Sequence, residues 1–311
     1  MTDAYKALRA LTLRQLRTFS VIARHLSFTA AARELHVTQP AISMQVKELE
    51  ELVGLPLHER VGRKLQLTEA GRELALCAQG VGDLLQQTHE RLLAMKGLTA
   101  GVLKLGAIST AKYFTPSLLA AFKRRHPQIT IRFTIGNRED VLRQLAENEC
   151  DLAITGRPPK DMDAVGQVFA PHPLIIVAAP DHPLAGKRRV DFARLADESF
   201  LTREPGSGTR VAMEEFFRAQ GQRSPDSVEM SSNETIKRAV MAGMGVAFIS
   251  AHTVGLELAS GRLVKLDIKG LPVMRNWYVV HLAAKRLSPI AESFREFLLE
   301  EGEAMMEKAV V

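Results

Sequence analysis

The chain has 311 residues, of which 46% are hydrophobic and 24% charged. This composition excludes a globally disordered chain, and the length predicts two or three domains. The formal net charge of +6 suits a polyanionic partner such as nucleic acid without requiring one. The two cysteines, Cys77 and Cys150, lie far apart, which indicates a reducing compartment and no disulfide framework.

No apolar run approaches the roughly 18 residues that a membrane-spanning helix needs. The first residues, MTDAYKALRALTLRQ, lack the apolar core of a signal peptide. We therefore expect a soluble, cytoplasmic protein with no membrane partner.

Residues 11–57 show helical periodicity with almost no strand signal. Within them, 26–54 reads LSFTAAARELHVTQPAISMQVKELEELVG. Ser27 or Thr29 would cap a short helix, and Thr38 a second one whose first turn holds Pro40. Two helices joined by a three-residue connection, HVT, predict a helix-turn-helix, although the pattern also fits a two-helix hairpin in a helical core.

The second helix has an apolar stripe and a small polar outer face. The stripe consists of Ile42, Val46, Leu49 and Val53, and the outer face of Pro40, Ser43, Met44, Lys47 and Glu51. Such a face suits a DNA major groove, where side chains reach base edges. We expect Gln39 and Ser43 to read bases and Lys47 to meet phosphate.

The next segment, LPLHERVGRKLQLT at 55–68, predicts two short strands around the basic turn Gly62, Arg63 and Lys64. A hairpin wing with cations at its tip, together with Arg60, would straddle the sugar-phosphate backbone. The candidate DNA-contacting residues are Ser27, Thr29, Thr38, Gln39, Pro40, Ser43, Met44, Lys47, Arg60, Arg63 and Lys64.

A long helix is expected from 68 to about 96. Leu74, Val81 and Thr88 recur every seven residues, and Cys77, Leu84 and Arg91 or Leu92 follow them by three or four. This spacing is typical of a coiled coil and predicts a dimer through the helix, although Gly80 and Gly82 interrupt it. GLTAG at 97–101 reads as a hinge.

From residue 102 onward, short apolar strands alternate with helical stretches, as in VLKLGAI, ITIRFTI, CDLAIT, PLIIVAAP, ESFLT, VAFIS and WYVVHLAA. This rhythm predicts two α/β subdomains with a mostly parallel sheet and a cleft between them. Ligands of such sheets bind at the carboxyl ends of strands. The candidate ligand-binding residues are Ser109, Thr110, Asn137, Arg138, Thr155, Arg157, Thr202, Arg203, Ser207, Thr209 and Asn233.

REPGSGTR at 203–210 places a glycine-rich turn before a helix, an arrangement that suits an anion. It lacks the Gly-Lys-Ser/Thr ending of a phosphate loop. Each hydroxyl in the candidate set also fits an ordinary helix cap. Taken together, hydroxyls and arginines at several strand ends favour a small anionic ligand. Neither a catalytic residue nor a metal-binding spacing is expected.

Residues 13–71 resemble the N-terminal signature of LysR-type transcriptional regulators. The matching marks are Phe19, SFTAAA, TQPAIS, Gln45, LVGLPL, Arg60 and LTEAG. The resemblance implies a winged helix-turn-helix at 1–68, a linker or dimerisation helix at 69–97 and an effector-binding domain at 98–311. That domain would resemble a periplasmic binding protein, with one subdomain at about 102–170 and 271–311 and another at about 171–270.

The same resemblance implies promoter DNA and RNA polymerase as partners, a tetramer as the working form, and an effector in the cleft instead of a cofactor. Two residues depart from the family pattern. His58 stands where the family usually has Phe, and Met44 stands where many members have a basic residue. Packing under the wing and base preference therefore do not follow from the resemblance.

Four later segments resemble the CbbR subgroup, which regulates Calvin-cycle operons. They are NREDVLRQLAENECDLAITGRPP, FLTREPGSGTR, SNETIKRAVMAGMGVAFIS and WYVVHLAAKRLSP. This resemblance implies an activator of carbon dioxide fixation genes that responds to a phosphorylated or related anion. The alternatives are a LysR-type regulator of another pathway with a carboxylate or aromatic-acid effector, and an enzyme acting on a phosphorylated substrate.

Overall fold

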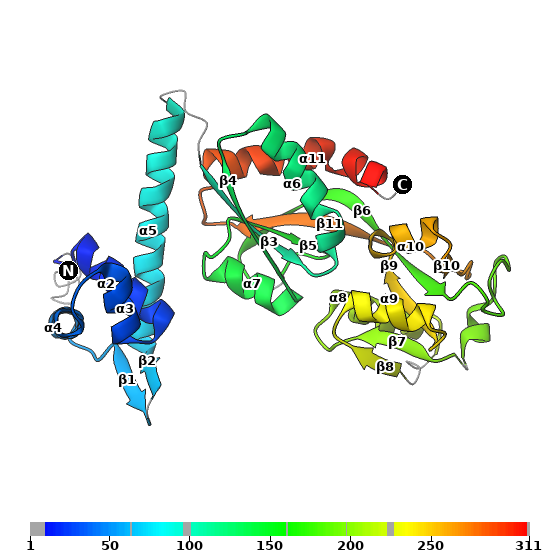
Figure 1. Ribbon diagram of the computed structural model, residues 1–311, viewed down its shortest axis with the longest axis horizontal. Coiled ribbons are helices and arrows are strands. Elements are labelled where there is room, and N and C mark those ends of the chain that lie inside the picture. The colour runs from blue at the N-terminus through cyan, green and yellow to red at the C-terminus, as the bar shows by residue number, and fades with distance from the viewer. Residues whose placement is uncertain are drawn as a thin grey trace. The chain divides into compact units, whose positions relative to one another are not determined.

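The computed structural model describes residues 10–62, 64–95, 101–159, 161–196, 198–222 and 227–309. Arg63 and all but the last residue of the expected hinge 97–101 lie outside this set. The chain forms two compact units, Met1–His89 and Glu90–Val311, and each is described by itself (Figure 1).

Within its described residues, the N-terminal unit contains three helices, a two-stranded hairpin and the start of a long helix. These elements are α2 (Leu13–His25), α3 (Phe28–Leu35), α4 (Gln39–Val53), β1 (His58–Val61), β2 (Lys64–Leu67) and α5 (Glu69–Met95). The Ser27 hydroxyl accepts a hydrogen bond from the Ala30 N–H at 3.3 Å and caps α3. Thr38 occupies the cap position of α4 without a side-chain hydrogen bond, and Pro40 lies in the first turn.

Two clusters of buried side chains hold the helices together. Ile42 and Val46 of α4 pack with Ile22 of α2 and Ala31 of α3. Leu49, further along the same stripe, packs with Leu16, Phe19, Leu57, Leu74 and Ala78. The apolar stripe expected on α4 therefore faces the core, and the first turns of α5 belong to the same core.

The hairpin is tighter than the sequence suggested. Val61 pairs with Lys64 across the antiparallel strands, so Lys64 is the first residue of β2 and not part of the turn. Gly62 has φ of +63°, a left-handed conformation that favours glycine in a tight two-residue connection.

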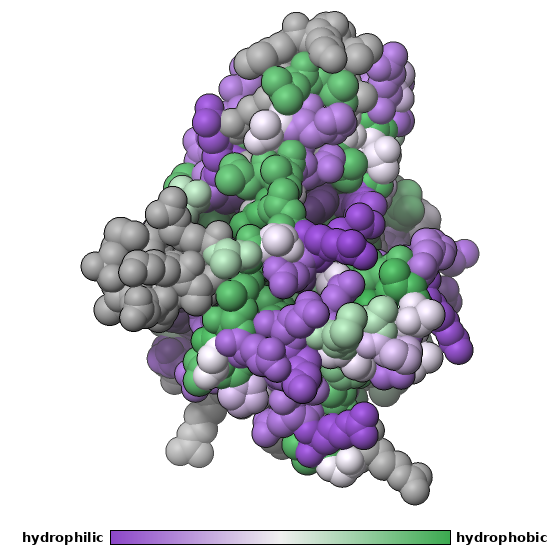
Figure 2. Space-filling model, turned by 90° about the vertical axis from the view of Figure 1, so that its left-hand side faces the viewer, coloured by the Kyte–Doolittle hydropathy of each residue, from purple (hydrophilic) through white to green (hydrophobic). Residues whose placement is uncertain are grey.

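The long helix α5 runs over 27 residues. In Figure 2, apolar side chains form an upright band among hydrophilic ones on the face turned to the viewer. Leu84, Leu85 and Leu92 are each more than half exposed.

No helix in the described residues is both long and apolar enough to cross a membrane.

The C-terminal unit is built on a nine-stranded sheet with the order β4-β3-β5-β11-β6-β9-β7-β8, and β10 pairs with β6. The strands are β3 (Val102–Ile108), β4 (Thr130–Gly136), β5 (Leu152–Thr155), β6 (Ala164–Ala178), β7 (Phe200–Arg203), β8 (Ser227–Met230), β9 (Val246–Ser250), β10 (Val264–Lys265) and β11 (Val273–Leu282). The helices are η1 (Ala111–Tyr113), α6 (Thr115–Arg125), α7 (Arg138–Ala146), η2 (Phe192–Leu195), α8 (Gly208–Ala219), α9 (Asn233–Met241), η3 (Ala251–Thr253), α10 (Gly255–Ala259) and α11 (Pro289–Ala309).

The expectation of a mostly parallel sheet is wrong for its middle. β3 pairs parallel with β4 and β5, and β7 pairs parallel with β8 and β9. The long strands β6 and β11 pair antiparallel with each other and with their other neighbours. Both strands are long and extend from one α/β half into the other (Figure 1).

Each half has its own core. In the first half, Phe114, Phe122 and Phe294 pack with Trp277. In the second half, alternate residues of one strand face opposite sides, as period-two geometry requires. Leu174 of β6 enters the cluster under α8, whereas its neighbour Ile175 enters the cluster under α9.

Candidate functional site

The exposed face of α4 carries the residues expected to read DNA. Gln39, Met44 and Lys47 are exposed, and Ser43 is half-buried. The Gln39 Nε2 donates a hydrogen bond to the Ser43 Oγ at 2.9 Å. The two candidate base readers therefore contact each other, and both can exchange this bond for one to a base edge.

The remaining DNA-contact candidates lie around this face. Thr29, Thr38 and Pro40 are exposed, whereas the Ser27 hydroxyl is occupied in capping α3. Arg60 and Lys64 are exposed on the wing, and Arg63 lies outside the described residues.

His58 ties the wing to the recognition helix. Its Nδ1 lies 3.0 Å from the Glu50 Oε1, which also accepts the Leu57 N–H at 2.8 Å. The His58 ring meets the Phe28 ring edge-on, with centroids 5.2 Å apart. A histidine here thus keeps an aromatic contact and adds a polar one.

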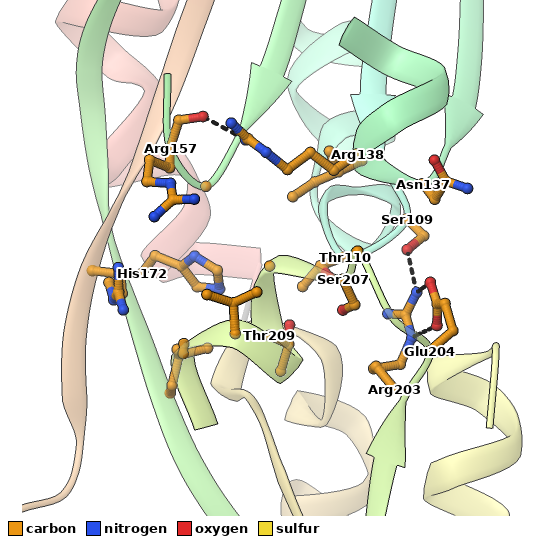
Figure 3. Close-up of a pocket in the computed structure, with 18 residues that line it drawn as sticks. Ser109, Thr110, Asn137, Arg138, Arg157, His172, Arg203, Glu204, Ser207 and Thr209 are labelled. Atoms are coloured by element: carbon orange, nitrogen blue, oxygen red, sulfur yellow. Dashed lines mark hydrogen bonds and ion pairs between the residues drawn. The ribbon is translucent and has the colours of Figure 1, made fainter. Parts of the chain in front are cut away.

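A cavity of about 280 Å³ opens between the two halves of the C-terminal unit (Figure 3). Both halves and the crossing strands β6 and β11 supply its lining. Eight of the eleven candidate ligand-binding residues line it: Ser109, Thr110, Asn137, Arg138, Arg157, Arg203, Ser207 and Thr209.

Three candidates lie behind the lining. The Thr155 hydroxyl donates to the Arg157 carbonyl at 3.0 Å, and the Thr202 hydroxyl donates to the Ser227 hydroxyl at 3.2 Å. The Asn233 Oδ1 accepts a hydrogen bond from Arg203 at 2.8 Å. All three side chains are buried.

Arg203 is a buried clamp between the halves. Its guanidinium binds both carboxylate oxygens of Glu204 at 2.7 Å, and its Nη2 also reaches the Ser109 hydroxyl of the other half at 3.1 Å. With Asn233 as a further partner, the side chain is only 4% exposed. Thr202 and Arg203 both belong to β7, although the sequence suggested that they follow the strand.

The start of α8 faces the cavity. Gly206 has φ of +84°, which turns the chain so that the helix begins at Gly208. Ser207 stands at the cap position without a side-chain cap hydrogen bond, and Thr209 lies in the first turn. The first N–H groups of a helix attract anions, because they lack partners within the helix.

Arg138 and Arg157 supply positive charge from the first half. Arg138 donates to the carbonyls of Arg157 at 2.6 Å and Pro158 at 3.3 Å, so it holds the loop after β5. Burial lowers the pKa of Arg138 from its usual value, and the nearby Arg157 lowers it further. Arg157 is exposed, and its guanidinium points toward the cavity (Figure 3).

Residues 13–72 match the family model of the bacterial regulatory helix-turn-helix protein, lysR family, and residues 96–303 match the LysR substrate binding domain. The chain belongs to the LysR family. This LysR-family protein is therefore a DNA-binding transcriptional regulator and not an enzyme, and its winged helix-turn-helix followed by an α/β effector domain confirms the fold expected from the sequence.

Two relatives match nearly the whole regulator. A RuBisCO operon transcriptional regulator from Allochromatium vinosum is 47% identical over 94% of this chain and 97% of its own. The HTH-type transcriptional regulator CfxR from Cupriavidus necator is 50% identical over 94% of this chain and 92% of its own. The regulatory domain of Synechocystis CcmR, solved with 2-phosphoglycolate, is 41% identical over 64% of this chain and 95% of its own, with a TM-score of 0.61.

The cavity of the LysR-family regulator also contains residues that the sequence analysis missed. His172, Glu204 and Arg275 line it, and Arg275 pairs with His172 across β11 and β6. Arg275 also forms an ion pair with Glu215 of α8. Both His172 and Arg275 lie inside long strands, so the rule that ligands bind at the carboxyl ends of strands does not select them. The only local signals are the two prolines that flank His172 in PHPL and the polar neighbour of Arg275 in MRNW.

Proposed function

We propose that this LysR-family regulator activates a carbon dioxide fixation operon, and that a small anion held between the two effector halves sets its activity. Identities of 47–50% with regulators that include a RuBisCO operon regulator support the choice of operon. The bound 2-phosphoglycolate of CcmR supports a phosphorylated, carboxylate-bearing ligand.

The observation that carries the effector proposal is the lining of the cavity. Arg157, the start of α8 and the hydroxyls of Ser109 and Thr110 all border one space of about 280 Å³. Charge-assisted hydrogen bonds from arginine and from backbone N–H groups are the strong contacts that phosphate and carboxylate groups form.

The ligand would change activity by contacting both halves at once. Ser109 and Arg157 come from the first half, whereas Ser207 comes from the second. A ligand shifts an equilibrium only by binding one arrangement more tightly than another. An anion bridging the halves meets this condition, because its contacts depend on how the halves lie against each other.

On the DNA side, the recognition helix α4 would enter the major groove and the wing would meet the backbone. A dimer through α5 would supply two recognition helices for a two-fold related site, and pairing of effector domains would give a tetramer. Because the target is promoter DNA, we propose that the protein works in the cytoplasm and with RNA polymerase.

Binding of the full-length protein to a RuBisCO promoter fragment and to a shuffled fragment tests the DNA half of this proposal. The promoter fragment should bind more tightly, and its affinity should fall steeply with salt as counterions are released. Equal affinity for both fragments at moderate salt would contradict the proposal.

Thermal shift with 2-phosphoglycolate, other sugar phosphates and aromatic acids tests the effector half. A ligand that binds only the native state raises the melting temperature, and the stabilisation grows with the logarithm of the ligand concentration above its dissociation constant. We expect stabilisation by phosphorylated acids in the wild type, loss in Arg157→Met, and no loss in Arg262→Met, where an exposed arginine lies outside the cavity lining. Stabilisation by aromatic acids alone would favour a different pathway.

A further inference from the structure

The short helix η1 belongs to the first half, yet it and the residues beside it contact the second half. Before η1, the Ser109 hydroxyl accepts a hydrogen bond from Arg203. At its end, the Tyr113 hydroxyl reaches α9. Directly after it, the Phe114 ring meets the His252 ring of η3 edge-on, with centroids 5.7 Å apart. This segment therefore contacts the second half at three points.

A charged cluster on the second half receives Tyr113. The Tyr113 hydroxyl donates a hydrogen bond to the Glu234 Oε1 at 2.7 Å. The Lys237 Nζ lies 3.0 Å from the same oxygen and 4.8 Å from the centre of the Tyr113 ring. Lys237 is only 5% exposed, and Glu257 of α10 also pairs with it, at 2.8 Å. A tyrosine of the first half thus completes an ion-pair cluster of the second half.

The bond between Tyr113 and Glu234 joins a protonated hydroxyl to an ionised carboxylate. Burial raises the pKa of Tyr113, and the hydrogen bond to Glu234 raises it further. Burial alone would raise the pKa of the Glu234 carboxyl, but the hydrogen bonds from Tyr113 and Lys237 outweigh this effect and lower it below its usual value. Hydrogen bonds to an ionised group are about twice as strong as those between neutral groups.

The chain connects this cluster to the cavity on both sides. Thr110, which lines the cavity, occupies the cap position of η1, three residues before Tyr113. Asn233, which accepts a hydrogen bond from Arg203, directly precedes Glu234 in α9. Neither Tyr113 nor Glu234 is among the residues that line the cavity. A change in how the halves lie against each other therefore acts on their bond and on the cavity lining together.

We propose that Tyr113 and Glu234 form a latch that holds the two halves in contact before any ligand binds. The latch is separate from the ligand contacts and sets the equilibrium on which a ligand acts. Its regulatory role rests on the proposed effector function, because a ligand that bridges the halves meets an arrangement that the latch has already assembled. Loss of the latch therefore weakens ligand binding although no ligand contact is removed.

Hydrogen exchange of the full-length, ligand-free protein tests the latch without any effector. Tyr113→Phe removes the hydroxyl and keeps the ring beside Lys237. The backbone amides of Phe114 and Ile236, each hydrogen-bonded next to the latch, should exchange about tenfold faster, the usual effect of losing a hydrogen bond to a charged group. Tyr278→Phe is the matched control, because it makes the same change in β11, outside this cluster, and it should leave both rates unchanged.

Glu234→Gln tests the latch from the second half, and it decides the matter if Tyr113→Phe does not fold. It keeps an acceptor but removes the charge, so exchange should accelerate by less than in Tyr113→Phe. The two effects should not add in the double variant, because both changes act on one bond. Unchanged exchange in the folded variants overturns the latch, as does an equal acceleration throughout the effector domain.

A second series with saturating 2-phosphoglycolate separates the latch from the proposed effector function. A ligand that bridges the halves should return exchange in Tyr113→Phe to the wild-type rate. If 2-phosphoglycolate slows exchange in neither protein, the effector proposal fails, whereas the latch stands on the ligand-free result.

Discussion

At the scale of single residues, Arg203 shows how burial changes the meaning of a charged side chain. The sequence placed it in a ligand-binding turn. In the folded protein its guanidinium donates hydrogen bonds to Glu204, Asn233 and Ser109. An anion has to compete with the Glu204 carboxylate for this group. Arg203 therefore acts first as a link between the two halves.

Replacing Arg203 should destabilise the protein even when no ligand is present. Arg203→Met leaves Glu204 and Asn233 without their partner, and breaking a buried ion pair costs about 3 kcal/mol in the free energy of unfolding. Arg203→Lys should recover little, because an ammonium cannot reproduce the paired contacts of the guanidinium.

Urea unfolding of the two variants and the wild type measures this cost. Arg143→Met is the matched control, since Arg143 is about half exposed in an i,i+4 pair with Glu147. Such surface pairs contribute about 0.5 kcal/mol. Equal effects at positions 203 and 143 would show that the clamp adds nothing to stability.

At the scale of elements, α4 and the wing divide the work of recognising DNA. Gln39 and Ser43 lie in the first two turns of α4, where a recognition helix meets base edges. Lys64 begins β2 on the wing, where a cation meets phosphate. Base contacts specify the sequence, whereas phosphate contacts add affinity for any duplex.

Gln39→Ala should therefore lower affinity for the promoter fragment and leave affinity for shuffled DNA almost unchanged. A lost base contact costs about 1–3 kcal/mol of discrimination. Lys64→Ala should lower the affinity for both fragments by the same factor. The slope of log affinity against log salt concentration should fall by about one phosphate contact. Fluorescence anisotropy over a salt series measures both quantities, and matching profiles for the two variants would refute the division.

The elements that the sequence predicted are those with a local signal. The cap of α3 at Ser27, the apolar stripe of α4 and the strand β3 can each be recognised within a dozen neighbouring residues. The pairing of β6 with β11 could not be predicted from local signals, because Trp277 pairs with Ala170 more than a hundred positions away. The first half of β6, AVGQVFAPH, has neither clear alternation nor a continuous apolar run.

The same distinction explains the site. Ser109, Asn137 and Arg157 follow predicted strands, so the strand-end rule found them. His172 and Arg275 became visible only through the antiparallel pairing of the two crossing strands. Thr155 and Thr202 were placed at the right strands, but strand geometry and burial turn both hydroxyls toward protein partners behind the lining.

At the scale of the whole molecule, α5 belongs to two different environments. In its first turns, Leu74 and Ala78 are buried in the core of the N-terminal unit. At about 100° per residue, the same face of the helix continues through Val81, Leu85 and Leu92. Beyond the N-terminal core, this face is uncovered, and Leu85 and Leu92 are 51% and 54% exposed. A second copy of the helix would bury them.

Leu85→Glu should therefore disrupt the proposed pairing of two subunits through α5, because it places a charge in the middle of the apolar face. Leu76→Glu is the control: Leu76 is 46% exposed on the opposite face of the same helix. Sedimentation at several concentrations should give a smaller assembly than the wild type for the first variant and the wild-type assembly for the second. Without the pairing through α5, two recognition helices are no longer held together for one two-fold promoter site, so the affinity for that site should fall toward that for a single half-site. A Leu85→Glu protein that still sediments as the wild type does would mean that another surface holds the subunits together.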